Sequence, residues 1–229
     1  MKNCYSIKSI IKNQNSKFMI YFFLIIFYSS NYSSAKDGYT NKNYIKDIFK
    51  ISTNELNSNN QSSEEMYISV YHGQSVDNSL KEIIFEGKRE YMSSYVNIIA
   101  LSSSRVTQFP NLHFEKEILL AKHTGMQHHL ETDLAINFRW QFVNEPFPLS
   151  LGYGNGISYA EKTPKLELAK GHDDTKRLLG YIMIDFEIEV PLLPTKPKVF
   201  FRIHHRSGIF GLFCRCGSNF PSLGYKSKI

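Results

Sequence analysis

The chain has 229 residues and a formal charge of +6, which allows one domain and is marginal for two. Four lysines and no acidic residue fall within positions 1–35, so the excess positive charge lies at the N-terminus and the rest is close to neutral. This distribution argues against a nucleic-acid partner, because nucleic-acid binding needs a basic face on the folded domain.

Residues 1–35 have the features of an export signal. A lysine-bearing stretch precedes an apolar run at 18–27, and Ser33-Ser34-Ala35 matches the small-x-small pattern at which signal peptidase cleaves. The run is short for a helix that spans a bilayer, and an uncleaved anchor is the alternative. We predict a signal peptide over 1–35, followed by a flexible segment over 36–65 that is rich in Asn and Ser and has little to bury.

From Met66 onward, strands with alternating character are expected. The clearest is 129–142, whose even positions are mostly apolar and whose odd positions are mostly polar. The segment 182–190 alternates in the same way. Further strands are predicted at 66–74, 95–107, 111–122, 147–160, 198–207 and 219–229. The stretch SLKEIIFEG, from Ser79, is a short helix or a loop, and the glycines at 152–156 are typical of a strand or turn rather than a phosphate loop.

Long strands with one apolar and one polar face fit two folds: a soluble sandwich or lipocalin-like barrel, or a membrane barrel whose apolar face meets lipid. The export signal, the strand lengths and the C-terminal strand favour the second. The predicted fold is therefore all-β, an eight-stranded antiparallel transmembrane β-barrel over 66–229. Its polar interior would leave no wide pore. Aromatic residues expected near the membrane interfaces are Phe109, Phe142, Phe147, Tyr153, Tyr159 and Tyr181.

The strand at 199–207 ends in an unusual polar group. Period two places His205 and Ser207 on its apolar, lipid-facing side, where polar side chains are costly unless they have a function. A histidine beside a serine can act as the base that activates the hydroxyl for attack on an ester. Gly208 would leave room there for an acyl chain.

The opposite face of the same strand carries Arg202, His204 and Arg206. These basic side chains are expected to pair with acidic residues on the inward face of the preceding strand, which are Asp185, Glu187 and Glu189.

Several segments resemble the outer-membrane lipid A 3-O-deacylase family and the related acyloxyacyl hydrolase-like proteins. The matching pieces are EILLAKHTG (117–125), RW (139–140), LGYGNGISYA (151–160), 178–190, FRIHHRSGIFG (201–211) and GSNFPSLGY (217–225). The resemblance covers roughly 66–229, and the block from HHRSG to GSN is its specific part. It implies an eight-stranded outer-membrane barrel that removes an ester-linked acyl chain from lipid A.

The resemblance also implies catalytic roles. Ser207 matches the nucleophile and His205 the general base, and the family's acidic residue, about twelve positions after the serine, corresponds to Asn219. The family has Asn where this chain has Gly208. This chain therefore lacks a possible oxyanion-hole donor at that position. Gly208, His204 and Arg206 are expected to contribute to substrate binding.

Cys214 and Cys216 are free apolar residues or a strained loop disulfide, and no metal or other cofactor is expected. The expected partners are lipid A or another outer-leaflet lipid and the bacterial outer membrane itself, with no prediction of oligomeric state. Three functions stay open: an outer-leaflet esterase, a catalytically inactive structural or interaction barrel, and a soluble secreted protein that binds an apolar ligand.

Overall fold

The structure, a computed structural model, describes residues 64–170, 175–193, 195–209, 213–214 and 216–229. The predicted signal peptide (1–35) and nearly all of the predicted flexible segment lie outside these residues. The strands are β1 (Glu65–Val76), β2 (Tyr91–Val106), β3 (Leu112–Gly125), β4 (Leu130–Val143), β5 (Leu149–Ala160), β6 (Leu178–Glu189), β7 (Lys198–Ser207) and β8 (Gly217–Lys228). Two short helical segments, η3 (Glu82–Glu86) and α3 (Lys165–Ala169), lie in connections.

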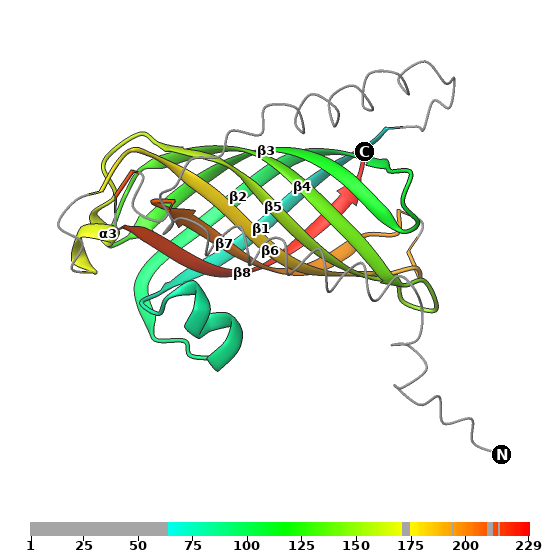
Figure 1. Cartoon of the computed structure of the whole chain (residues 1–229), viewed down its shortest axis with the longest axis horizontal. Coiled ribbons are helices and arrows are strands. Elements are labelled where there is room, and N and C mark those ends of the chain that lie inside the picture. The colour runs from blue at the N-terminus through cyan, green and yellow to red at the C-terminus, as the bar shows by residue number, and fades with distance from the viewer. Residues whose placement is uncertain (1–63, 171–174, 194, 210–212, 215) are drawn as a thin grey trace, which may run out of the picture. The chain divides into compact units, whose positions relative to one another are not determined.

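The eight strands form one closed antiparallel barrel in which each strand pairs with its neighbours in sequence (Figure 1). β1 closes the barrel by pairing with β8, for example at Val70 opposite Tyr225. Closure provides hydrogen-bond partners for the backbone N–H and C=O groups that would be unpaired at the edges of an open sheet. The predicted fold class is confirmed. Among the described residues, no helix has the length and apolar character needed to cross a bilayer.

Side chains alternate between the two faces of the barrel wall, as β4 illustrates. From Leu130 to Arg139, exposed and buried residues alternate without a break. The exposed set includes Leu134 and Ile136, whereas Glu131 and Asp133 are fully buried. The outer surface is therefore apolar and the interior polar, as predicted from the period of two.

The interior is filled by a network of ion pairs. Arg139 donates to Asp185 at 2.8 Å and to Glu115 at 3.1 Å. Arg202 donates to Glu117 at 2.7 Å and to Asp185 at 2.8 Å. Because these charges lie in a water-poor core, their mutual pairing is what makes their burial tolerable.

The two ends of the barrel differ. The described parts of the connections at 77–90, 161–177 and 208–216 lie at one end together with the short one at 126–129, and those of the tighter connections at 107–111, 144–148 and 190–197 lie at the other. We call the first the long-loop end.

The predicted aromatic girdle is only partly present. Phe109 and Phe147 are exposed at the end opposite the long loops, and Tyr159 is exposed near the long-loop end. The prediction was wrong for Tyr181, which is 1% exposed and lies inside the barrel with its ring centroid 4.9 Å from that of His204.

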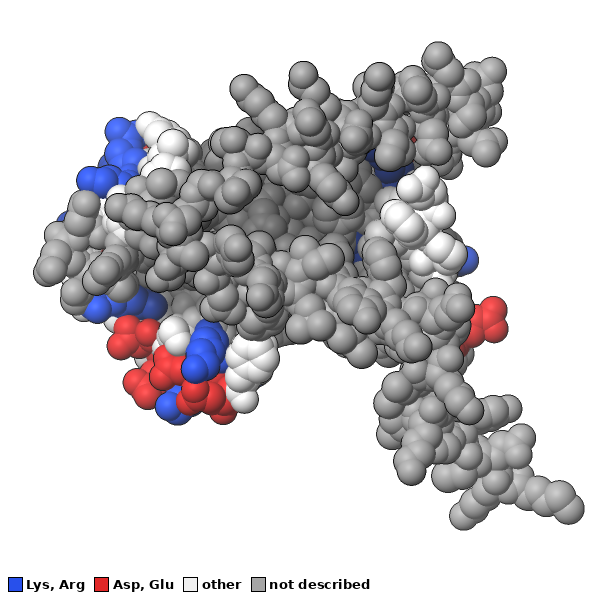
Figure 2. Space-filling view, viewed as in Figure 1, with Lys and Arg blue, Asp and Glu red and all other residues white. Residues whose placement is uncertain are grey.

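The connection at 77–90 folds back on the barrel through η3. Ser79 and Glu82 form a reciprocal capping box, in which the backbone N–H of Ser79 donates to the Glu82 carboxylate at 2.9 Å and the backbone N–H of Glu82 donates to Ser79 Oγ at 3.3 Å. Gly87 ends the turn in the left-handed conformation. Buried Ile83 packs with Ile203 of β7, so this outward position of β7 is covered by protein. Acidic and basic side chains gather where this connection lies (Figure 2).

Candidate active site

The candidate site is built on the pairing of β7 with β8. His205 lies directly opposite Asn219, so both side chains are on the outer face of the barrel wall. His205 Nδ1 and Asn219 Oδ1 are 2.6 Å apart. His205 is half-buried and Asn219 is 5% exposed. The pair predicted from the resemblance is therefore in contact, although the two residues lie on different strands.

The orientation of Asn219 is set by a second hydrogen bond. Its Nδ2 donates to the backbone carbonyl of Asn78 at 2.8 Å, and the side chain of Asn78 in turn accepts from the backbone N–H of Glu90 at 2.6 Å. Because the amide nitrogen faces a carbonyl, the amide oxygen faces His205 and can only accept. A neutral His205 therefore carries its proton on Nδ1, so Nε2 is unprotonated and can act as a base.

Ser207 lies one step further along the same face and is half-buried. Its Oγ accepts a hydrogen bond from the backbone N–H of Ile209 at 3.1 Å. Ile209 has a φ of 48°, a left-handed conformation that a β-branched residue rarely adopts. Its side chain lies over Gly180, where an added Cβ would come within 2.7 Å of Ile209 Cγ1. Among the described residues, His205 and Ser207 share a face but make no hydrogen bond to each other.

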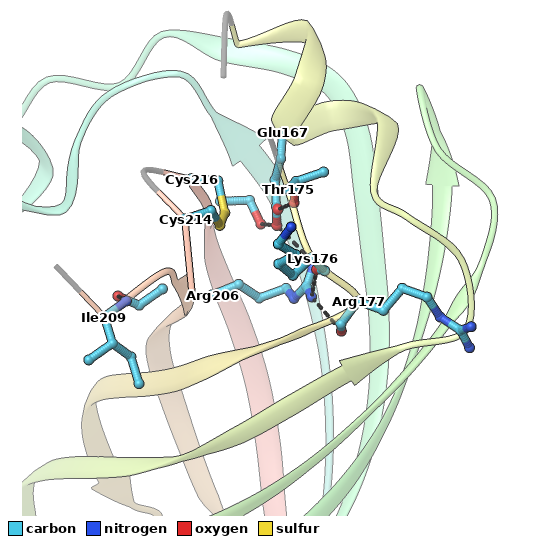
Figure 3. Close-up of a disulfide and its surroundings, with 10 residues drawn as sticks. Glu167, Thr175, Lys176, Arg177, Arg206, Ile209, Cys214 and Cys216 are labelled. Carbon is cyan, nitrogen blue, oxygen red and sulfur yellow. Dashed lines mark hydrogen bonds and ion pairs between the residues drawn. A yellow bond between two sulfur atoms is a disulfide. The ribbon is translucent and has the colours of Figure 1, made fainter. Parts of the chain in front are cut away.

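Gly208 does not provide the space that the sequence suggested. A Cβ at this position would lie 2.0 Å from the carbonyl oxygen of Cys214, so the following connection fills the space. The Gly208 N–H donates to the carbonyl of Cys216 at 3.0 Å. Cys214 and Cys216 form a disulfide, which decides between the two states predicted for them (Figure 3).

His204 and Arg206 lie on the inner face of β7, with exposed fractions of 0% and 1%. Arg206 donates to Glu167 of the α3 segment at 2.8 Å and to the carbonyl of Arg177 at 3.1 Å (Figure 3). The two residues therefore support β7 from within, and a lipid outside the barrel would have no direct contact with them.

The predicted pairing of the inward residues holds in part. Arg202 bonds to Asp185 as expected, at 2.8 Å. His204 and Arg206 instead pair with Glu131, at 2.9 Å and 3.2 Å, on a strand that faces β7 across the interior.

Lys170 ties the α3 segment to the 77–90 connection beside the site. Its Nζ donates to the backbone carbonyl of Val76 and lies 3.9 Å from the Asp77 carboxylate. Burial lowers the pKa of Lys170, while Asp77 and Glu167 act in the opposite direction. Lys170, Asn78 and Ile209 were not singled out from the sequence, since each acts through a loop whose path has no periodic signal.

Comparison with known proteins yields structural likenesses only. No family model and no curated protein matches the chain. Among solved structures, the outer membrane enzyme PagL matches at a TM-score of 0.49 and 16% identity, over 71% of this chain and 99% of the other. Neisserial surface protein A (NspA) matches at a TM-score of 0.45 and 10% identity, over 73% of this chain and 99% of the other. Both likenesses concern the fold alone.

Proposed function

We propose that the chain is an outer-membrane esterase that removes an ester-linked acyl chain from lipid A or a related outer-leaflet lipid. The observation that carries this proposal is the outward His205–Asn219 pair, 2.6 Å apart, with Ser207 next on the same face. A histidine oriented by a fixed acceptor beside a hydroxyl is the arrangement that activates a serine.

The position of the pair supports a lipid substrate. The apolar outer face of the strands suits contact with acyl chains, and outer-membrane barrels carry their longer loops on the extracellular side. Ser207 is the last residue of β7 at the long-loop end. The site would then lie at the level of the outer leaflet, next to the ester bonds that link acyl chains to a headgroup.

The proposed chemistry is acyl transfer through serine. Ser207 Oγ attacks the ester carbonyl while His205 Nε2 takes the hydroxyl proton, giving a tetrahedral oxyanion. Collapse expels the headgroup alkoxide, which takes that proton from His205. Water, deprotonated by His205, then attacks the acyl-serine, and as the fatty acid leaves, Ser207 Oγ takes the proton back from His205. The Ile209 N–H, 3.1 Å from Ser207 Oγ, is the candidate oxyanion donor in place of Gly208, whose N–H is engaged by Cys216.

The test is mass spectrometry of lipid A from cells that express the wild-type chain or Ser207→Ala, with membrane insertion confirmed for both. We expect loss of one acyl chain with the wild type and none with the variant. Ser103→Ala, which changes another half-buried outward serine on β2, should leave the activity intact. Unchanged lipid A with the inserted wild type, together with no fatty acid released from added phospholipid, would refute the proposal.

A catalytically inactive structural or interaction barrel is the second candidate. Two observations favour it: Ser207 and His205 are not hydrogen-bonded to each other, and an amide rather than a carboxylate faces His205. This candidate predicts that the phenotype of the protein follows changes in the long loops and is insensitive to Ser207→Ala.

A further inference from the structure

A second group of titratable side chains lies inside the barrel, away from the candidate active site. Glu131 and Asp133 are on the inward face of β4, and His204 is on the inward face of β7. All three have an exposed fraction of 0%. One ligand atom from each lies within 4.8 Å of those of the other two.

The three side chains converge. His204 Nε2 lies 2.9 Å from Glu131 Oε1 and 3.6 Å from Asp133 Oδ2. Glu131 is held in place from outside the trio by His123, whose Nε2 is 3.1 Å from Glu131 Oε2. His123 is fixed in turn by Gln127, 3.0 Å from its Nδ1. Ligands at metal sites are commonly oriented by such an outer layer of hydrogen bonds.

The hydrogen bonding of this group is incomplete. Among the described residues, neither oxygen of Asp133 has a hydrogen-bond partner in good geometry, although the carboxylate is completely buried and Ser158 lies opposite it on β5. The Nδ1 of His204 also has none, nor does the Nε2 of the neighbouring His129. A buried carboxylate without a donor is costly, so a ligand that satisfies Asp133 would be bound firmly.

The local charges leave room for a dication. Arg206 lies 3.2 Å from Glu131 and 2.8 Å from Glu167, so its one positive charge is shared between these two carboxylates. The carboxylates of Glu131, Asp133 and Glu167 together therefore exceed the charge of Arg206 by two, with imidazoles around them.

We propose that Glu131, Asp133 and His204 bind a divalent first-row transition ion inside the barrel, for which Zn²⁺ is the natural probe. Two carboxylates and one imidazole suit Zn²⁺ or Mn²⁺, and water would complete the coordination. The sequence alone predicts no metal here, because the ligands come from strands that are far apart in the chain. The ion would join β4 to β7 across the interior and takes no chemical part in the proposed esterase reaction.

The test uses the full chain without an affinity tag, refolded in detergent micelles with Zn²⁺, desalted, and analysed for bound metal. Barrel formation is checked in each sample by the heat-dependent mobility shift on a gel. We expect about one equivalent of zinc in the wild type. Asp133→Asn should bind less than a tenth of that amount. His128→Gln, which changes an exposed histidine close to the group, should bind as the wild type does.

X-ray absorption at the zinc edge of the wild type provides a measurement that does not depend on whether a variant folds. Nitrogen and oxygen ligands without sulfur are expected, since both carboxylates and one imidazole supply the ligand atoms. Sulfur ligands would place the ion at the cysteines and overturn the proposal. So would a folded wild type that keeps no zinc, or a folded Asp133→Asn that keeps all of it.

Discussion

The amide at position 219 is the feature of the candidate site whose replacement is most informative. Asn219→Asp keeps the shape of the side chain and places a negative charge opposite His205, where Asn219 Oδ1 now lies 2.6 Å from Nδ1. A carboxylate stabilises the imidazolium that forms during proton transfer, whereas an amide stabilises it only through its dipole. We therefore expect the variant to hydrolyse esters faster than the wild type.

The magnitude follows from two opposing effects. A charge about 4 Å from the imidazolium contributes about 4 kcal/mol at an effective dielectric constant of about 20. The same change removes the donor to the Asn78 carbonyl, now 2.8 Å away, which costs folding free energy and loosens the side chain. That loss is about 1–3 kcal/mol. If about half of the electrostatic gain reaches the transition state, the rate rises by roughly 30-fold, which corresponds to about 2 kcal/mol.

The assay compares purified, refolded proteins in mixed micelles. Fatty acid release from lipid A gives kcat, and urea unfolding followed by gel mobility gives the free energy of unfolding. Asn97→Asp is the matched control, because Asn97 Oδ1 also contacts a histidine on the outer face, 2.9 Å from His72 Nδ1. That variant should leave kcat unchanged. An Asn219→Asp protein that is less stable, as expected, but no faster than the wild type would refute the assigned role of Asn219.

Two further predictions concern stability. Arg202→Met leaves buried Glu117 without the cation that contacts it and takes one of two arginine partners from Asp185, which keeps Arg139. The free energy of unfolding should fall by about 3–5 kcal/mol in urea titrations, and a loss below about 1 kcal/mol would contradict the interior network described above. Ile83→Ser should detach the 77–90 connection from the outer wall and make it sensitive to protease while the barrel stays folded. Ile84→Ser changes a side chain that is already 41% exposed, so it should leave the protease sensitivity of the connection unchanged. Equal cleavage of the two variants would show that Ile83 does not anchor this connection.

The strands could be predicted because their evidence is local. In 129–142, a period of two is sufficient to assign each side chain to a face, and Leu134 and Asp133 lie on the sides expected of them. The pairing of His205 with Asn219 is not local, since it depends on the register of β7 against β8, and only the resemblance pointed to it.

Loop packing could not be predicted at all. Nothing in the sequence around Gly208 indicates that Cys214 lies against it, or that Asn78 bonds to Asn219. For a similar reason, only some of the ion-pair partners of the inward-facing charged residues could be predicted from the sequence. Arg202 bonds to a neighbouring strand, whereas Arg206 reaches α3, which no pattern in the sequence links to β7.

The two neighbouring histidines of β7 connect these findings. His204 points into the barrel and His205 points out, so the wall separates a buried charged interior from a surface suited to lipid. Sites built on strands hold their geometry more closely than sites on loops. The interior partners of His204 and Arg206 therefore position the outer pair as well, because a shift of β7 moves both faces together. Loosening the interior at Glu131 should thus affect the alignment of His205 with Asn219, although Glu131 itself never meets the lipid.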